Sequence, residues 1–412
     1  MQIKEEIRRL AAAAEDECAA QFKEIDETAR FNQEKVLDAF ISNRVSETCF
    51  SHTTGYGYGD TGRDTLDKIY AEVFGAEDAL VRHNIVNGTH CLTIALFSVL
   101  RPGDTLLAAT GKPYDTLEEV IGISGESGNG SLRDFGVNYK QVDLKKDGTI
   151  DFEALKTALT PDVQAVILQR SKGYDWRQTL SCAALGEAIS FIKSIKSDAV
   201  CIVDNCYGEF AERTEPTQHG ADLIVGSLIK NPGGGLAQSG GYIVGKKKYV
   251  ELAAYRQTAP GLGAECGATL GQNRFMYQGF FTAPHVVAQA LKTAVFSGAL
   301  LEKLGCEVNP KPHEPHTDII QAVKFGDEDK LIKFIQAIQK ASPVDSYALP
   351  MPWDMPGYQH QVIMAAGTFV SGASIELSAD APIKPPYVCF MQGGITYESA
   401  RLAVMSAAGE LV

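Results

Sequence analysis

Short apolar runs alternate with helical patterns over residues 79–245, and this alternation constrains the fold more than any other feature. The runs lack a polar face, as expected of strands buried on both sides. Strands that alternate with helices are typical of βαβ units and a mainly parallel sheet. The expected strands are 104–110, 137–144, 163–170, 199–205, 221–228 and 240–245, and the expected helices between them are 88–100, 115–122, 151–159 and 181–196.

The flanking segments have other patterns. Residues 2–40 are amphipathic and helical, and after a Gly/Tyr-rich loop at 50–64 a helix is expected at 64–74. A long helical stretch at about 283–303 leads into a Pro-rich junction. Beyond it we expect strands at 318–325, 361–367, 373–379 and 387–394, with helices at 327–340 and 396–407.

These patterns predict an α/β protein with a mainly parallel central sheet and a smaller α+β C-terminal domain. The predicted domains are an N-terminal helical arm with an interface loop at 1–60, a large domain at 61–300 and a small domain at 301–412.

Composition excludes several functional classes. The net charge of −13 disfavours a nucleic-acid partner, because an acidic surface repels phosphate backbones. No stretch approaches the length of a membrane span, and the charged start of the chain has no apolar signal region. The nine cysteines form no CxxC pair, which favours reduced thiols. We therefore expect a cytoplasmic enzyme that acts on a small molecule.

Two successive strands end on groups that suit pyridoxal phosphate chemistry. Asp204 follows one apolar run directly, and Ser227 and Lys230 end the next. Ligands of open parallel sheets bind at the carboxyl ends of the strands. A lysine can form a Schiff base with the aldehyde of pyridoxal 5'-phosphate, and an acid can keep its pyridine nitrogen protonated. We assign the Schiff base to Lys230 and the partner of the pyridine nitrogen to Asp204. The alternative is that Asp204 is a turn residue and Lys230 a solvated lysine at the end of a strand.

A phosphate site is expected where a helix begins at Gly88, Thr89 and His90, since a helix N-terminus offers free N–H groups and a favourable dipole. The Ser227 hydroxyl would add to it. A simple N-cap explains this sequence equally well. Tyr114 is placed to cover the pyridine ring, with His90 as its competitor for that role.

The chain resembles fold-type-I pyridoxal phosphate enzymes, which have an aspartate aminotransferase-like fold. Within their cystathionine and methionine branch, it is similar to the family of aluminium resistance proteins related to methionine gamma-lyase. The resemblance spans residues 20–410 and rests on segments 55–82, 110–122, 168–177, 203–210, 227–245, 259–267 and 391–405.

The resemblance implies a homotetramer, a dimer of dimers with shared active sites. In related lyases a Tyr/Arg loop of the neighbouring subunit reaches the cofactor phosphate, and Tyr56, Tyr58 and Arg63 match that loop approximately. The resemblance supports the roles given above: Gly88 and Thr89 match the phosphate-binding turn, Tyr114 the stacking aromatic, Asp204 the partner of the pyridine nitrogen, Ser227 a phosphate-binding serine and Lys230 the Schiff-base lysine.

The chain departs from those lyases at two points. They carry a second hydroxyl residue just before the lysine, where this chain has Ile229. Their C-terminal arginine, which binds the substrate carboxylate, has no clear counterpart. The substrate-binding candidates are Arg170, Arg177, Lys384 and Arg401.

The function expected from these residues is a pyridoxal phosphate-dependent lyase of the cystathionine beta-lyase or methionine gamma-lyase type. Lys230, with a pKa lowered by a desolvated, cationic site, would remove the Cα proton of a sulfur amino acid. Tyr114 would assist proton transfer to the leaving group, and β- or γ-elimination would release a thiol. The alternatives are a transaminase, an aldolase, a γ-replacement enzyme, or a stress-related protein that binds the cofactor without turnover.

Three further motifs indicate other functions less strongly than the residues above indicate pyridoxal phosphate chemistry. Residues 57–62 match GxGxxG, but the preceding segment is too polar for the buried strand of a dinucleotide site. Ser227 to Lys230 matches SxxK without the companion motifs of an acyl-enzyme. His313, His316 and Asp318 lie among prolines, so we expect a solvated junction and no metal.

Overall fold

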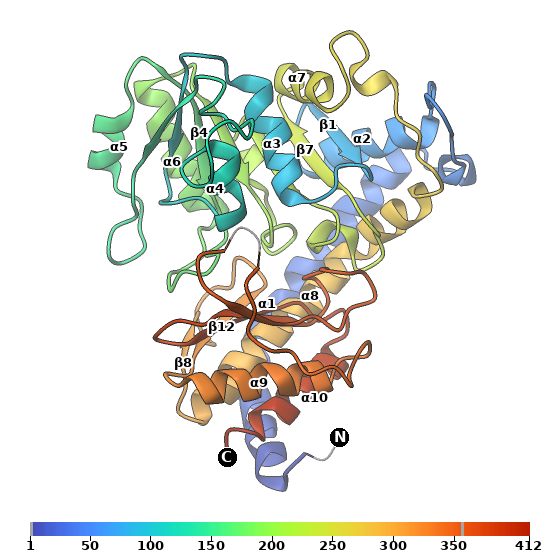
Figure 1. Cartoon of the computed structure of the whole chain (residues 1–412). Coiled ribbons are helices and arrows are strands. Elements are labelled where there is room, and N and C mark those ends of the chain that lie inside the picture. The colour runs from blue at the N-terminus through green and yellow to red at the C-terminus, as the bar shows by residue number, and fades with distance from the viewer. Residues whose placement is uncertain (1–2, 356–357) are drawn as a thin grey trace.

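The computed structural model of the protein describes residues 3–355 and 358–412, so residues 1 and 2 of the predicted arm lie outside it. Figure 1 shows an α/β part at the top and a smaller part with its own sheet below. Two long helices, α1 (Glu5–Ser42) and α8 (Asn273–Lys303), pack against each other and run through both parts. Among the described residues, no helix has the length and apolarity needed to cross a membrane.

The upper part is built on a seven-stranded sheet with the order β1-β7-β6-β5-β4-β2-β3. Strands β3, β2, β4, β5 and β6 pair in parallel, whereas β7 is antiparallel to both of its neighbours. The predicted mainly parallel sheet is therefore confirmed. Its strands are β1 (Asp78–Arg82), β2 (Thr105–Ala108), β3 (Asn138–Gln141), β4 (Val163–Gln169), β5 (Val200–Asp204), β6 (Leu223–Ser227) and β7 (Gly241–Gly245).

The helices expected between these strands are present, and polar side chains cap several of them. Asn87 caps α3 by accepting a hydrogen bond from the His90 N–H, and Ser181 caps α6 in the same way through Ala184. The helices of this part are α2 (Thr61–Val73), α3 (Gly88–Val99), α4 (Asp115–Ile121), α5 (Phe152–Ala158), α6 (Cys182–Ile195) and α7 (Lys247–Gln257), with 3-10 turns at Glu47–Phe50, Pro216–His219, Asn231–Gly233 and Gly263–Glu265.

The lower part contains an antiparallel five-stranded sheet with the order β10-β11-β12-β9-β8. Helices α9 and α10 lie below this sheet in Figure 1. This arrangement confirms the expected α+β pattern at the C-terminal end. The elements are β8 (Glu307–Asn309), β9 (Ile320–Lys324), α9 (Glu328–Lys340), β10 (Val362–Ala365), β11 (Ser378–Pro382), β12 (Val388–Gln392) and α10 (Tyr397–Ala408).

Two predicted elements begin five or more residues away from their observed starts. The strand expected at 373–379 begins only at Ser378, because the Glu376 carboxylate accepts hydrogen bonds from the Phe369 and Val370 N–H groups and belongs to a loop. Helix α8 begins ten residues before the predicted position and includes Pro284. Burial of its first two turns in the core outweighs the helix-breaking effect of that proline.

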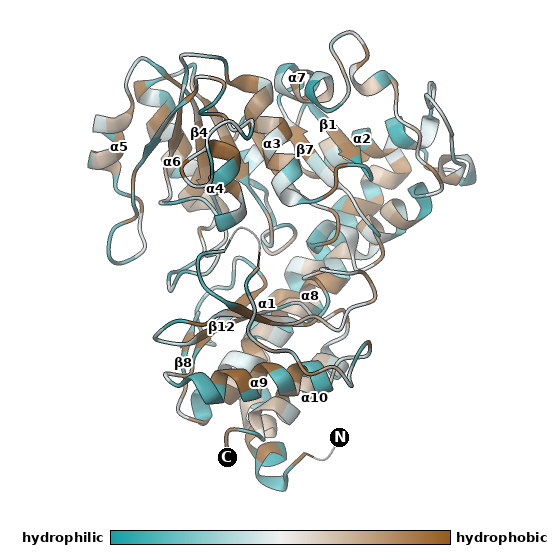
Figure 2. Cartoon of the chain, viewed as in Figure 1, coloured by the Kyte–Doolittle hydropathy of each residue, from teal (hydrophilic) through white to brown (hydrophobic). Residues whose placement is uncertain are grey.

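The two long helices contribute to both apolar cores. Near the start of α1, Ile7, Ala11 and Cys18 pack with the lower sheet and α10, whereas Val36 near its end packs with the upper core. In helix α8, buried residues from Met276 to Leu291 belong to the upper core, and those from Val295 to Leu301 belong to the lower core. Figure 2 shows hydrophobic residues, in brown, concentrated in the strands and on the inner sides of the helices. Burial of these faces holds the two sheets on either side of a shared cavity.

Candidate active site

A cavity of about 360 Å³ lies between the carboxyl ends of β5 and β6 and the lower sheet. This volume is within the range of small-molecule sites. The predicted residues that line it are Gly88, Thr89, Tyr114, Asp204, Ser227 and Lys230, and other lining residues include Asn87, Thr116, Gln169, Cys206, Tyr207, Ile229, Met355, Met364, Ser374, Ser378, Asp380 and Gln392.

Asp204 is the last residue of β5, where parallel pairing on both sides fixes its backbone. One of its carboxylate oxygens accepts a hydrogen bond from the Cys206 N–H at 3.2 Å. The other forms no hydrogen bond with the described residues, and the side chain is 8 % exposed at the cavity wall. A carboxylate held in this way can accept a hydrogen bond from a protonated ring nitrogen.

Lys230 lies three residues beyond β6, and its Nζ is 4.0 Å from the centroid of the Tyr207 ring. Burial alone would lower the pKa of Lys230, but Cys206, Tyr207 and Asp204 outweigh burial and raise it. The expected lowering of this pKa is therefore wrong. The reason is that the cavity is not cationic, since its charged lining groups among the described residues are Asp204, Asp380 and Lys230.

The start of α3 forms a third wall of the cavity. The backbone N–H groups of Gly88 and Thr89 donate no hydrogen bond to the described residues, whereas the His90 N–H is used by the Asn87 cap. A Cβ added at Gly88 would lie 3.6 Å from Cys206 Sγ and 3.8 Å from the Ser227 Cβ. Gly88 thus keeps open a space beside two free donors, at the positive end of a helix dipole.

These walls fit pyridoxal phosphate. A phosphate would be held by Gly88, Thr89 and Ser227, a pyridine nitrogen by Asp204, and an aldehyde would face Lys230. Thr116 can supply the hydroxyl that the chain lacks at Ile229, because its Oγ1 is 2.7 Å from that of Thr89 at the same wall.

Tyr114 also lines the cavity. Its backbone N–H donates to Gln169 Oε1 at 2.8 Å, and its hydroxyl lies 2.6 Å from that of Tyr358. Burial raises the pKa of Tyr114 well above its usual range. The hydroxyl therefore stays protonated at neutral pH and can donate a proton or a hydrogen bond.

Replacing Gly88 with alanine is expected to weaken cofactor binding without unfolding the protein. The new methyl group meets its neighbours at ordinary contact distances but fills the space beside the free N–H groups. We expect the dissociation constant of pyridoxal phosphate to rise at least ~10-fold. Titration of the cofactor-free protein, followed by visible absorption, measures this change. Unchanged affinity at an unchanged melting temperature would contradict the phosphate site.

His90 does not line the cavity. Its Nδ1 accepts a hydrogen bond from the Val86 N–H at 3.1 Å, so the ring turns toward its own loop. Neither the phosphate role nor the stacking role predicted for His90 fits this position.

The loop residues Tyr56, Tyr58 and Arg63 also lie outside the cavity of their own chain. The two tyrosine rings stack on each other and are 75 % and 58 % exposed, which leaves them free to contact another molecule. Arg63 is buried, and its Nη1 donates to the backbone carbonyls of Gly57 and Gly267. Its guanidinium therefore holds the loop in shape and is not free to bind a phosphate.

Three of the four substrate-binding candidates are committed elsewhere. Arg170 is fully buried and donates to Asn205 and Glu212 at 2.7 and 2.6 Å. Arg177 donates to backbone carbonyls, and Arg401 pairs with Glu15 on α1 at 2.7 Å. The donor groups of these arginines are thus used within the protein, and none of the three arginines is among the lining residues of the cavity.

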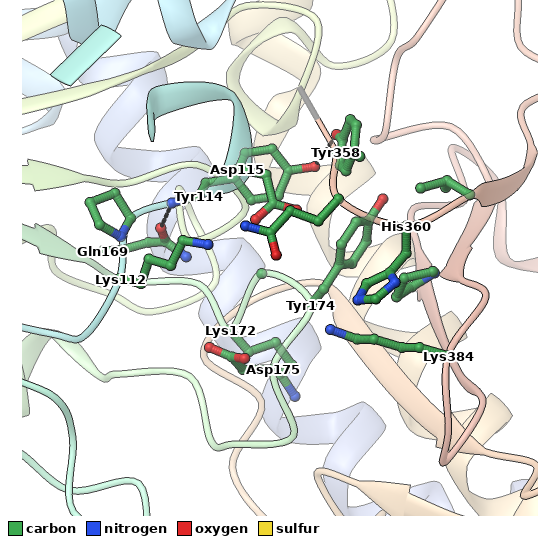
Figure 3. Close-up of a pocket in the computed structure, with 15 residues that line it drawn as sticks. Lys112, Tyr114, Asp115, Gln169, Lys172, Tyr174, Asp175, Tyr358, His360 and Lys384 are labelled. Atoms are coloured by element: carbon green, nitrogen blue, oxygen red, sulfur yellow. Dashed lines mark hydrogen bonds between the residues drawn. The ribbon is translucent and has the colours of Figure 1, made fainter. Parts of the chain in front are cut away.

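Lys384, the fourth candidate, lines a neighbouring pocket of about 160 Å³. Figure 3 shows this pocket, where Lys384 and His360 come from the lower part of the protein and Lys112 and Tyr114 from the upper part. The pocket shares Tyr114, Gln169 and Gly173 with the main cavity. Lys384 therefore lines a pocket that adjoins the main cavity.

Sequence reasoning missed the residues that the lower sheet brings to the cavity, above all Asp380 and Gln392. It also missed Tyr207, whose ring faces Lys230. Tyr207 could have been suspected from its position three residues after Asp204. No local pattern marks Asp380 or Gln392.

The chain is similar to known proteins over almost its whole length. The sequence matches the methionine gamma-lyase family over residues 7–412. It is 53% identical to the uncharacterized protein YnbB of Bacillus subtilis (strain 168), over 98% of this chain and 96% of that protein. A carbon-sulfur lyase involved in aluminium resistance from Clostridium novyi NT has a solved structure with a TM-score of 0.96 and 50% identity, covering 100% of this chain and 97% of that one.

A more distant structure shows the fold alone. The pyridoxal-5'-phosphate dependent protein YhfS of Escherichia coli superposes with a TM-score of 0.60 at 16% identity, over 93% of this chain and 96% of that one. The predicted relationship to fold-type-I enzymes and to the methionine gamma-lyase relatives is thus confirmed. With a match that covers almost its whole length, the chain belongs to the methionine gamma-lyase family.

Proposed function

We propose that this protein is a pyridoxal phosphate-dependent carbon–sulfur lyase that acts on a sulfur amino acid. The observation that carries the proposal is the meeting of Asp204, Lys230 and the open start of α3 in one cavity. Membership of the methionine gamma-lyase family and the 50% identity to a carbon-sulfur lyase support it.

The chain's residues have distinct parts in this reaction. When bound, the cofactor draws electrons from the substrate Cα and makes its proton acidic. Asp204 would hold a proton at the pyridine nitrogen of a bound cofactor by accepting its hydrogen bond. In its neutral form, Lys230 Nζ would take the Cα proton, since it is the one amine that lines the cavity among the described residues. The protonated Tyr114 hydroxyl donates a proton to the departing sulfur. Lys384, beside the cavity, offers a charge for a substrate carboxylate.

Product analysis tests this function. The purified protein, loaded with pyridoxal phosphate, is incubated separately with methionine, cystathionine and cysteine. Elimination consumes water and releases a thiol or sulfide, a 2-oxo acid and ammonia without any added acceptor. A transaminase would need a 2-oxo acid acceptor, and a γ-replacement enzyme would need an added nucleophile. Cofactor bound with no product from any of these amino acids would contradict the lyase.

We also propose that the enzyme is a cytoplasmic homotetramer, a dimer of dimers with shared sites. The exposed Tyr56 and Tyr58 and their distance from their own cavity support a role toward a second copy. All nine cysteines are free, which suits a reducing compartment.

Mixing two defective chains is expected to restore activity. In a mixed dimer of Lys230→Ala and Tyr58→Ala chains, one site has both an intact Lys230 and an intact Tyr58 from its partner. Random mixing should therefore give roughly a quarter of wild-type activity from two nearly inactive variants. Tyr347→Ala, which changes an even more exposed tyrosine of the lower part, is the control. Mixtures no more active than their components, or a fully active Tyr58→Ala protein, would contradict shared sites.

A further inference from the structure

We propose that Asp380 makes this enzyme selective for amino acids whose side chain carries a positively charged group beyond the sulfur. In this view the carboxylate accepts a hydrogen bond from that group inside the cavity. The inference rests on the proposed function and names the substrate class of the same site.

Asp380 is held rigidly at the cavity wall. It is the central residue of β11 and lies opposite Phe390 of β12. Gln392, also on β12, donates a hydrogen bond from Nε2 to Asp380 Oδ2 at 2.8 Å and another to Ser378 Oγ at 3.1 Å. Two strands and an amide therefore fix the direction of the carboxylate before a substrate arrives.

The second carboxylate oxygen has no hydrogen-bond partner among the described residues. Asp380 Oδ1 is buried and forms no hydrogen bond with the described residues. An unpaired buried carboxylate oxygen is unfavourable, and a ligand that brings a donor removes that cost. The side chain lines the cavity, so the donor can come from a molecule bound there after a small adjustment of the carboxylate.

The charges around the cavity favour a cation at this position. Asp204 would face the ring of a bound cofactor and Lys230 its aldehyde, which leaves Asp380 as the one formal charge contributed by the lower part among the described lining residues. Burial raises the pKa of Asp380 to about 6, while Gln392 and Lys230 hold it down. The carboxylate is thus mainly ionised at neutral pH, and it attracts cations and repels anions.

The group recognised is distal and not the α-amine. The α-amine has to approach Lys230, whereas the hydrogen bond that the Asp380 carboxylate accepts within the described chain comes from Gln392 and not from Lys230. A group several bonds from Cα can reach the lower sheet while the α-amine stays near Lys230.

Binding of three side-chain analogues that lack a sulfur leaving group tests the proposal. Lysine, norleucine and 2-aminoadipate carry a cationic, a neutral and an anionic side chain of similar length. The cofactor-loaded protein is titrated with each, and the change in cofactor absorption gives the dissociation constant. We expect wild type to bind lysine at least ~10-fold more tightly than norleucine, and 2-aminoadipate most weakly.

The variant Asp380→Asn should lose the preference for lysine and leave norleucine affinity within about 2-fold, because the amide keeps the shape without the charge. Asp380→Glu should restore part of the preference, and Asp329→Asn, on the exposed face of α9, should leave it unchanged. If Asp380→Asn does not fold, Asp380→Ser replaces it in the same titrations. The affinities of wild type for lysine and norleucine then still test whether the cavity prefers a cationic side chain.

The possible failures are distinguishable. If no amino acid perturbs a bound cofactor, or no cofactor binds, the proposed function itself fails. If wild type binds norleucine as tightly as lysine, or Asp380→Asn keeps the full preference, the role of Asp380 is overturned while the lyase proposal stands.

Discussion

Replacing Lys230 with alanine is expected to abolish carbon–sulfur lyase activity. The variant loses both the amine that would hold the cofactor covalently and the base that would take the Cα proton, and no other lysine of the described chain lines the cavity. General-base catalysis alone is worth about 10² to 10⁴-fold in rate, so turnover should fall at least to that extent. Thiol release and the visible absorption band of the bound cofactor are the two measurements.

The control for this prediction is Lys333→Ala, which removes an exposed lysine from α9. It should keep both the band and the activity. A Lys230→Ala protein that retains the wild-type band after dialysis would show that another amine carries the cofactor. Retained turnover would show that another group takes the proton.

Replacing Asp204 with asparagine should separate cofactor binding from catalysis. The amide fits the end of β5 and can still accept the hydrogen bond from the Cys206 N–H. It lacks the negative charge that would keep the pyridine nitrogen protonated. Loss of a preorganised electrostatic partner typically costs about 10² to 10³-fold in kcat. We expect that loss in steady-state kinetics, together with a cofactor stoichiometry close to that of wild type.

Asp198→Asn is the matched control, since Asp198 precedes the same strand and its side chain is 72 % exposed. It should not change kcat. An Asp204→Asn enzyme with wild-type kcat would contradict the assigned contact with the ring nitrogen. An equal loss in both variants would indicate damage to β5 and not to the chemistry.

The local sequence pattern predicted the site residues that directly follow a single strand or begin a single helix. Asp204 and Lys230 follow runs of buried apolar residues, and parallel strands bring such ends to one edge of the sheet. The start of α3 was also predictable, because Asn87 precedes an apolar helix.

The remaining residues depend on contacts between distant segments, which a single sequence does not display. Asp380 reaches the cavity through the pairing of β11 with β12 and the packing of that sheet against α8. Arg170 shows the converse case. An arginine just after a strand suggests a carboxylate anchor, but Glu212 and Asn205, both far along the chain, bind it inside the protein.

The path of α1 has a consequence for synthesis of the chain. Ile7, Ala11 and Cys18 pack against residues of the lower core that include Val404 and Met405, and Lys4 Nζ donates to the carbonyl of Gly409. Lys4 and Gly409 are 405 positions apart in the chain, so this end of α1 cannot complete its packing until α10 has also been synthesised. At roughly 5 to 20 residues per second, that interval lasts some tens of seconds, during which part of the apolar face of α1 stays uncovered.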